Sequence, residues 1–214
     1  MINNIVSTAT LFASLSVGQI LGSVMPSENL LARQKISLEQ RHQVPFVNEV
    51  FKDNILLNIA YLEGSVSDPK AIDWGKVRGF SKYEFTLNPG ETFAYHQDGL
   101  PEYKIVKTTN TRFNAQDGFK FSGLLYGDGV CHLASLIKWV SEDAGLKVLA
   151  PTNHNFATIP QIDKINGVSI YYNPGANLAN ARQNLYVTNN KNKVVKFVFE
   201  YDQVDLSLSV AEIN

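Results

Sequence analysis

The chain has 214 residues, enough for one well-packed core with a smaller appendage. With 19 basic and 20 acidic residues its formal net charge is -1, and no basic stripe along the chain predicts binding to nucleic acid. A single cysteine excludes an intramolecular disulfide and any zinc or iron–sulfur site built from several cysteines.

The N-terminal stretch bears on the compartment. Residues 5–25 carry no charged side chain and are about long enough to span a bilayer. The stretch is rich in serine and threonine, and no lysine or arginine precedes it, which is atypical of a signal peptide. We interpret residues 1–25 as an export signal or membrane anchor, which predicts an exported or membrane-anchored, extracytoplasmic protein. The alternative is an ordinary amphipathic helix in a cytoplasmic protein.

Two segments that follow are expected to be helical. Residues 27–44 carry a partial apolar face, which ends where Pro45 disfavours a helical conformation of the residue before it. A better-patterned apolar stripe runs over residues 46–62, and Gly64 is expected to end that helix. We therefore predict that residues 26–81 form a helical N-terminal segment.

From residue 82 the pattern changes to alternation of apolar and polar residues, which is typical of strands. Strands are expected at residues 82–87, 92–96, 148–150, 168–172, 185–188, 194–201 and 204–213. The last three resemble an antiparallel meander with one buried face. The predicted fold is α+β: N-terminal helices, then a mainly antiparallel sheet with the helix of Cys131 packed on it. Residues 82–214 are expected to form this domain.

The only cysteine begins an apolar-periodic helix. Cys131 follows the turn Gly127-Asp128-Gly129. In the first turn of a helix, unpaired backbone N–H groups and the helix dipole favour a thiolate. Asp128 is expected to cap the helix, although its negative charge would raise the thiol pKa. A cysteine that is merely buried fits the same position.

A candidate thiol site combines Cys131 with two residues downstream. The order Cys131, His154, Asn177 matches that of papain-like enzymes, in which the histidine is the base and the asparagine orients it. Gly129, Asp128 and His132 would support the site, with backbone N–H groups at the helix start stabilising the oxyanion. The alternative is that Cys131 is buried and that His154 and Asn177 are turn residues.

Metal binding is the weaker interpretation of the same residues. Zinc accepts histidine and cysteine ligands, and His132, His154, His96 and Cys131 are available. Adjacent residues on a helix diverge by about 100°, however, and no His-x3-His or Cys-x2-Cys pair exists in the chain. We therefore expect no metal and no cofactor, and we interpret His132 as a helix-surface or supporting residue.

Several motifs resemble one known family. The run Gly127-Asp128-Gly129-Val130-Cys131-His132-Leu133-Ala134-Ser135-Leu136 resembles the signature of the VanW family, named for a member of vancomycin-resistance clusters. In register with it, residues 87–93 resemble the family's Pro-Gly-Glu-x-Phe segment, and residues 174–177 resemble its Pro-x-Gly-x-Asp-Ala. His154 matches the histidine that the family has between its cysteine motif and its Pro-x-Gly-x-Asp-Ala motif. The resemblance covers about residues 82–201.

Three departures accompany the resemblance: His132 replaces the usual Gln, Asp128 a Gly, and Asn177 the usual Asp. The family implies a bacterial, envelope-associated protein but supplies no reaction. The leading hypothesis is acyl transfer or amide hydrolysis on peptide or cell-wall material by Cys131, His154 and Asn177. The alternative is a non-catalytic module that binds peptide or peptidoglycan and has an inert buried cysteine.

Overall fold

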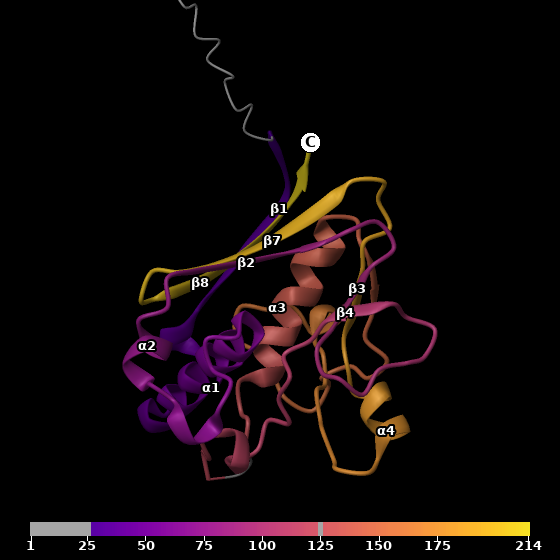
Figure 1. Cartoon of the computed structure of the whole chain (residues 1–214). Coiled ribbons are helices and arrows are strands. Elements are labelled where there is room, and N and C mark those ends of the chain that lie inside the picture. The colour runs from indigo at the N-terminus through magenta and orange to yellow at the C-terminus, as the bar shows by residue number, and fades with distance from the viewer. Residues whose placement is uncertain (1–26, 124–125) are drawn as a thin grey trace, which may run out of the picture.

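The computed structural model describes residues 27–123 and 126–214. Figure 1 shows one long sheet above the helices and a second, smaller sheet beside them. The strands are β1 (Glu28–Ser37), β2 (Lys82–Leu87), β3 (Thr92–Ala94), β4 (Ile105–Lys107), β5 (Lys147–Leu149), β6 (Tyr186–Thr188), β7 (Val194–Tyr201) and β8 (Asp205–Ile213). The helices are α1 (Pro45–Glu63), α2 (Trp74–Arg78), α3 (Val130–Asp143) and α4 (Asn177–Arg182), with short 3-10 turns η1 (Leu38–Gln40), η2 (Pro69–Ala71), η3 (Ala115–Asp117) and η4 (Lys164–Asn166).

Each sheet has four strands. The first has the order β1-β8-β7-β2 and is antiparallel throughout. The second has the order β4-β3-β6-β5, in which only β3 and β4 run parallel. The predicted α+β class with antiparallel strands is therefore confirmed. The predicted meander is correct for the hairpin of β7 and β8, but β6 belongs to the second sheet.

The largest correction concerns residues 27–37, which were predicted to be helical. They form β1, which pairs along its length with β8 near the other end of the chain, so that Ile36 lies opposite Leu206. The apolar residues here fit a partial helical face, but pairing with a distant strand decides the conformation. Residues 26–81 are thus not a separate helical segment. The second predicted helix is confirmed as α1, and Gly64 ends it in the left-handed region at φ 90°.

A second correction concerns residues 168–172, which alternate like a strand but pair with none. Their backbone instead contacts side chains of α3. The N–H of Val168 donates to the Ser135 hydroxyl at 2.9 Å, and the N–H of Ile170 donates to the Cys131 sulfur at 3.4 Å. This segment therefore covers the cysteine face of α3.

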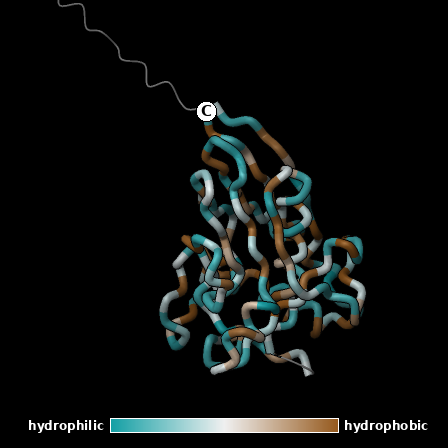
Figure 2. Tube along the Cα trace, turned by 90° about the vertical axis from the view of Figure 1, so that its right-hand side faces the viewer, coloured by the Kyte–Doolittle hydropathy of each residue, from teal (hydrophilic) through white to brown (hydrophobic). Residues whose placement is uncertain are grey.

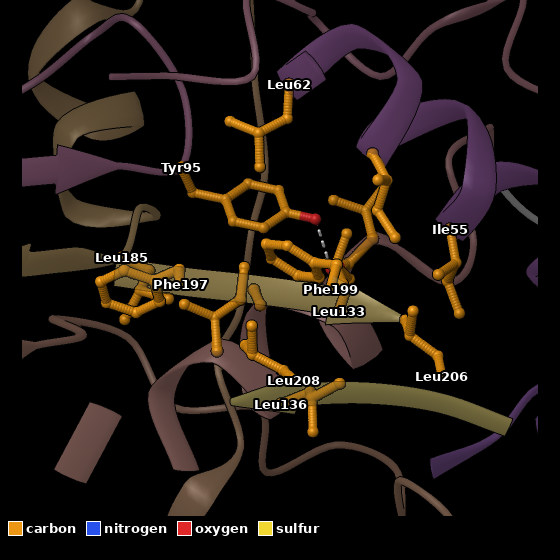
Figure 3. Close-up of a cluster of buried hydrophobic side chains, with 14 of the residues drawn as sticks. Ile55, Leu62, Tyr95, Leu133, Leu136, Leu185, Phe197, Phe199, Leu206 and Leu208 are labelled. Carbon is orange, nitrogen blue, oxygen red and sulfur yellow. Dashed lines mark hydrogen bonds between the residues drawn. The ribbon is translucent and has the colours of Figure 1, made fainter. Parts of the chain in front are cut away.

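Helix α3 lies at the centre of the molecule. It contacts β1 and β8 of the first sheet, β5 of the second sheet, and α1. Figure 3 shows Leu133 and Leu136 of α3 among side chains of the first sheet such as Phe197. Hydrophobic and hydrophilic segments are interspersed along the trace in Figure 2, as expected for strands with one buried face. The Tyr95 hydroxyl, buried in this core, donates to the Val130 carbonyl at 3.0 Å.

The start of α3 is packed directly against α1. Gly129 has φ 102°, and a Cβ there would lie 2.6 Å from the carbonyl oxygen of Phe51. Gly127 has φ 81°, and its Cβ would lie 2.8 Å from the carbonyl oxygen of Phe113. The buried Asn54 of α1 donates to the Asp128 carbonyl at 2.9 Å. The glycines of the motif are therefore required by close backbone packing.

No helix within the described ranges is both long and apolar enough to cross a membrane. The predicted export signal or anchor at residues 1–25 lies outside those ranges.

We predict that Gly129→Ala destabilises the protein by at least about 2 kcal/mol, because backbone strain and overpacking against Phe51 add together. Gly175→Ala is the matched control, since Gly175 also has positive φ, at 82°, but a Cβ there meets no atom within 4 Å. It should cost about 1 kcal/mol. Urea denaturation measures both variants. Equal losses would contradict the close packing of α3 on α1.

Candidate functional site

Cys131 is the second residue of α3, so the predicted position in the first helical turn is confirmed. Asp128 does not cap this helix, contrary to expectation. The N-cap is Gly129, and no side chain caps the helix. The Asp128 carboxylate instead accepts a hydrogen bond from the Ser122 hydroxyl. With the Asp128 carboxylate bonded to Ser122, the first N–H groups of α3 have no side-chain cap.

The sulfur of Cys131 faces the backbone of Ile170. It accepts from the Ile170 N–H at 3.4 Å and lies 3.7 Å from the Ile170 carbonyl oxygen, to which the thiol donates. Cys131 is half-buried by its exposed surface, but the sulfur itself is enclosed, and its desolvation raises the pKa of the thiol to about 11. The Ile170 N–H opposes this rise, and the negative charge of Asp128 adds to it. At neutral pH the group is therefore a protonated thiol, despite its place at the start of a helix.

His154 is buried and lies in a loop after β5. Its Nδ1 is 3.2 Å from the carbonyl oxygen of Ala157, and its ring centroid is 3.9 Å from that of Phe156. Burial lowers the pKa of His154, and the Ala157 carbonyl opposes that shift. Its ring also lies nearly perpendicular to the ring of His132, with 6.5 Å between centroids.

Asn177 is the first residue of α4 and is exposed. Cys131, His154 and Asn177 all lie in the described part of the chain, and no hydrogen bond joins any two of them. The Nδ1 atom of His154, which an orienting asparagine would hold, faces the Ala157 carbonyl instead. The three residues thus do not form the hydrogen-bonded chain that a papain-like site uses.

The segment beside α3 explains why the histidine is not at the sulfur. This segment runs antiparallel to the helix, with Ile170 at Cys131, Val168 at Ser135 and the Ile165 carbonyl at Lys138. His154 packs against this segment at Gly167, where a Cβ would lie 3.2 Å from that of the histidine. On α3, the side chain next to the His154 ring is therefore that of His132, not that of Cys131.

His132 is buried, so its interpretation as a helix-surface residue is wrong. The reason is that α1 covers this side of α3: the Phe51 ring lies 4.9 Å from that of His132. Within the described residues, Nδ1 of His132 has no hydrogen-bond partner. Burial above all, together with the nearby Arg41, His154 and His42, lowers the pKa of His132 to about 3. It is a neutral imidazole in a basic neighbourhood.

Comparison with protein-family models, curated proteins and solved structures gives no match. The resemblance to the VanW family therefore rests on the sequence motifs alone. Within the described ranges, no group of three or more histidine, cysteine, aspartate or glutamate residues could hold a metal ion.

One feature of the surface was missed by the sequence reasoning. A pocket of about 670 Å³ is lined by residues 39–44 together with Thr158 and Pro160. None of the three candidate catalytic residues lines it. In the sequence, Arg41 and His42 resemble residues at a helix end before Pro45. Their place beside Thr158 depends on contact between two loops that are far apart in the sequence.

We predict that His132 makes the fold acid-sensitive. The native-state pKa of about 3 lies below the ordinary value of 6.5. The unfolded chain therefore takes up the proton first, and stability falls as pH drops from 6.5 towards 3. His132→Phe keeps an aromatic ring beside Phe51 but cannot take up this proton. Between pH 7 and pH 4 the free energy of unfolding of wild type should fall by up to about 3 kcal/mol more than that of the variant. Urea denaturation at both pH values measures this. Equal losses in the two proteins would contradict the prediction.

Proposed function

We propose that this chain is a non-catalytic binding module of the bacterial cell envelope that recognises peptide or cell-wall material and in which Cys131 is structural. The observation that carries the proposal is the surroundings of the Cys131 sulfur. The thiol exchanges hydrogen bonds with the Ile170 backbone, and burial raises its pKa to about 11. A nucleophilic cysteine needs the opposite, a lowered pKa and a base within reach.

The envelope assignment rests on the sequence. The motifs around residues 87–93, 127–136 and 174–177 resemble the VanW family, which implies an envelope-associated bacterial protein. The uncharged residues 5–25 fit an export signal or membrane tether. Within this proposal the domain descends from a papain- or transglutaminase-like fold that has kept a cysteine helix packed on an antiparallel sheet. In this module the helix is retained for packing.

The competing function is acyl transfer or amide hydrolysis by Cys131, His154 and Asn177. One observation favours it: Cys131 is in the first turn of α3, where backbone N–H groups can stabilise an oxyanion. That function requires the Ile170 backbone to leave the sulfur and the His154 ring to replace it. The alkylation rate of the thiol separates the two functions.

We expect native Cys131 to react slowly with iodoacetamide. The rise in thiol pKa from 9.0 to about 11 reduces the thiolate fraction about 100-fold at neutral pH relative to the same protein unfolded in urea. Rates measured by mass spectrometry between pH 6 and pH 9 should rise steadily with pH. A fast rate with a plateau below pH 8 would instead identify an activated thiolate and overturn the structural role of Cys131.

We also expect the protein to co-sediment with purified peptidoglycan, and Cys131→Ser to co-sediment to the same extent. Serine keeps a small group that can hydrogen-bond to the Ile170 backbone, so folding should survive. The measurement is the bound fraction after centrifugation, with the thermal midpoint of each protein as the folding control. Absence of binding by the wild type would overturn recognition of cell-wall material, and loss confined to a folded Cys131→Ser would overturn the inert role.

A further inference from the structure

The pocket between residues 39–44 and the loop at Thr158 contains a buried positive charge. Arg41 forms part of its wall, although only 1% of its surface is exposed. Its Nε donates to the Ser37 carbonyl at 2.7 Å, and Nη1 donates to the Pro160 carbonyl at 3.1 Å. Nη2 donates to the side-chain oxygen of Gln161. All three acceptors are neutral.

No carboxylate of the described residues forms an ion pair with Arg41. A guanidinium has five N–H groups, and three are used, which leaves one on each terminal nitrogen. Burial lowers the pKa of Arg41 to about 10, so the group still carries its charge at neutral pH. A buried charge without a counter-ion is unfavourable, and in most proteins such a charge is paired.

Among the residues that line the pocket, no free negative charge balances Arg41. His42 also lines the pocket, and Arg41, His42 and His154 all lie close enough to the buried His132 to lower its pKa. Glu39 is the only acidic residue lining the pocket, and its carboxylate is held by Lys52 Nζ at 2.6 Å.

We propose that this pocket binds the carboxylate of a peptide ligand, which supplies the counter-ion that the Arg41 charge in the pocket wall lacks. Arginine pairs readily with carboxylates, and one N–H on each terminal nitrogen of Arg41 has no acceptor among the described residues. Val44, which is 50% exposed, and Pro160 give the same pocket an apolar wall for the side chain next to the carboxylate. A volume of about 670 Å³ is typical of small-ligand sites. This inference rests on the proposed function, because it names the ligand group that the binding module recognises.

The test compares N-acetyl-leucine with N-acetyl-leucinamide by isothermal titration calorimetry. The two differ only in that the carboxylate is replaced by a neutral amide. The acid should bind at least about tenfold more tightly than the amide, and its affinity should fall when salt is raised. Equal affinity for acid and amide would overturn the proposal.

Arg41→Gln should abolish the preference for the acid, but Arg41 also ties the Ser37 backbone to the Pro160 loop, so this variant could fail to fold. Glu39→Gln keeps the test decisive, because it removes the negative charge that lines the pocket and frees Lys52. The acid should then bind about threefold more tightly, with no change for the amide.

Glu49→Gln is the matched control. Glu49 also contacts Lys52, at 3.8 Å, but does not line the pocket. Glu49→Gln also removes one negative charge next to Lys52. An equal rise in affinity for the acid in both variants would overturn the assignment to this pocket. If the acid is not preferred while peptidoglycan still co-sediments, the pocket assignment fails and the proposed function stands. Failure of both measurements would overturn both.

Discussion

The arrangement of the molecule depends on the contact between the start of α3 and the side of α1. At Gly129 the backbone of one helix meets the Phe51 carbonyl of the other, at a distance that leaves no room for a Cβ. The buried Asn54 side chain fixes this approach by binding the backbone on both sides of the loop, at Lys120 and at Asp128. Because α3 also contacts both sheets, its direction at this point determines how the two sheets are placed around it.

The same contact changes the meaning of the Gly-Asp-Gly-Val-Cys motif. A cysteine after a glycine turn at a helix start suggests an activated thiol, and a helix dipole favours an anion by roughly 0.3–1 kcal/mol. Burial of Cys131 raises its pKa from 9.0 to about 11, and two pKa units correspond to about 2.7 kcal/mol. Burial therefore outweighs the dipole. Gly129 is explained by packing against α1, Gly127 by packing against the Phe113 carbonyl, and the cysteine by its contact with the Ile170 backbone.

The predictions from sequence were right where periodicity is strong and local. Helices α1 and α3 and strands β2, β7 and β8 have clear apolar patterns and were found within a few residues. β1 was missed because its conformation is decided by β8, which lies at the opposite end of the chain. Residues 168–172 alternate like a strand, yet their N–H groups bond to Ser135 and Cys131 side chains. Order along the chain could not show that His154 faces His132 and that Asn177 is exposed, because both depend on loop paths.

Two buried charged side chains, Asp53 and Arg41, differ in whether the fold pairs them with opposite charges. Asp53 of α1 is buried, but Arg78 and Lys120 both pair with it, and these contacts keep its pKa below the ordinary value despite burial. Its charge is thus neutralised within the fold and holds α1 to α2. Arg41 is buried to the same extent, yet its guanidinium donates only to neutral oxygens, and none of the described carboxylates pairs with it. Because the fold pairs Asp53 twice and leaves Arg41 unpaired at a pocket wall, the missing counter-ion is best supplied by a ligand.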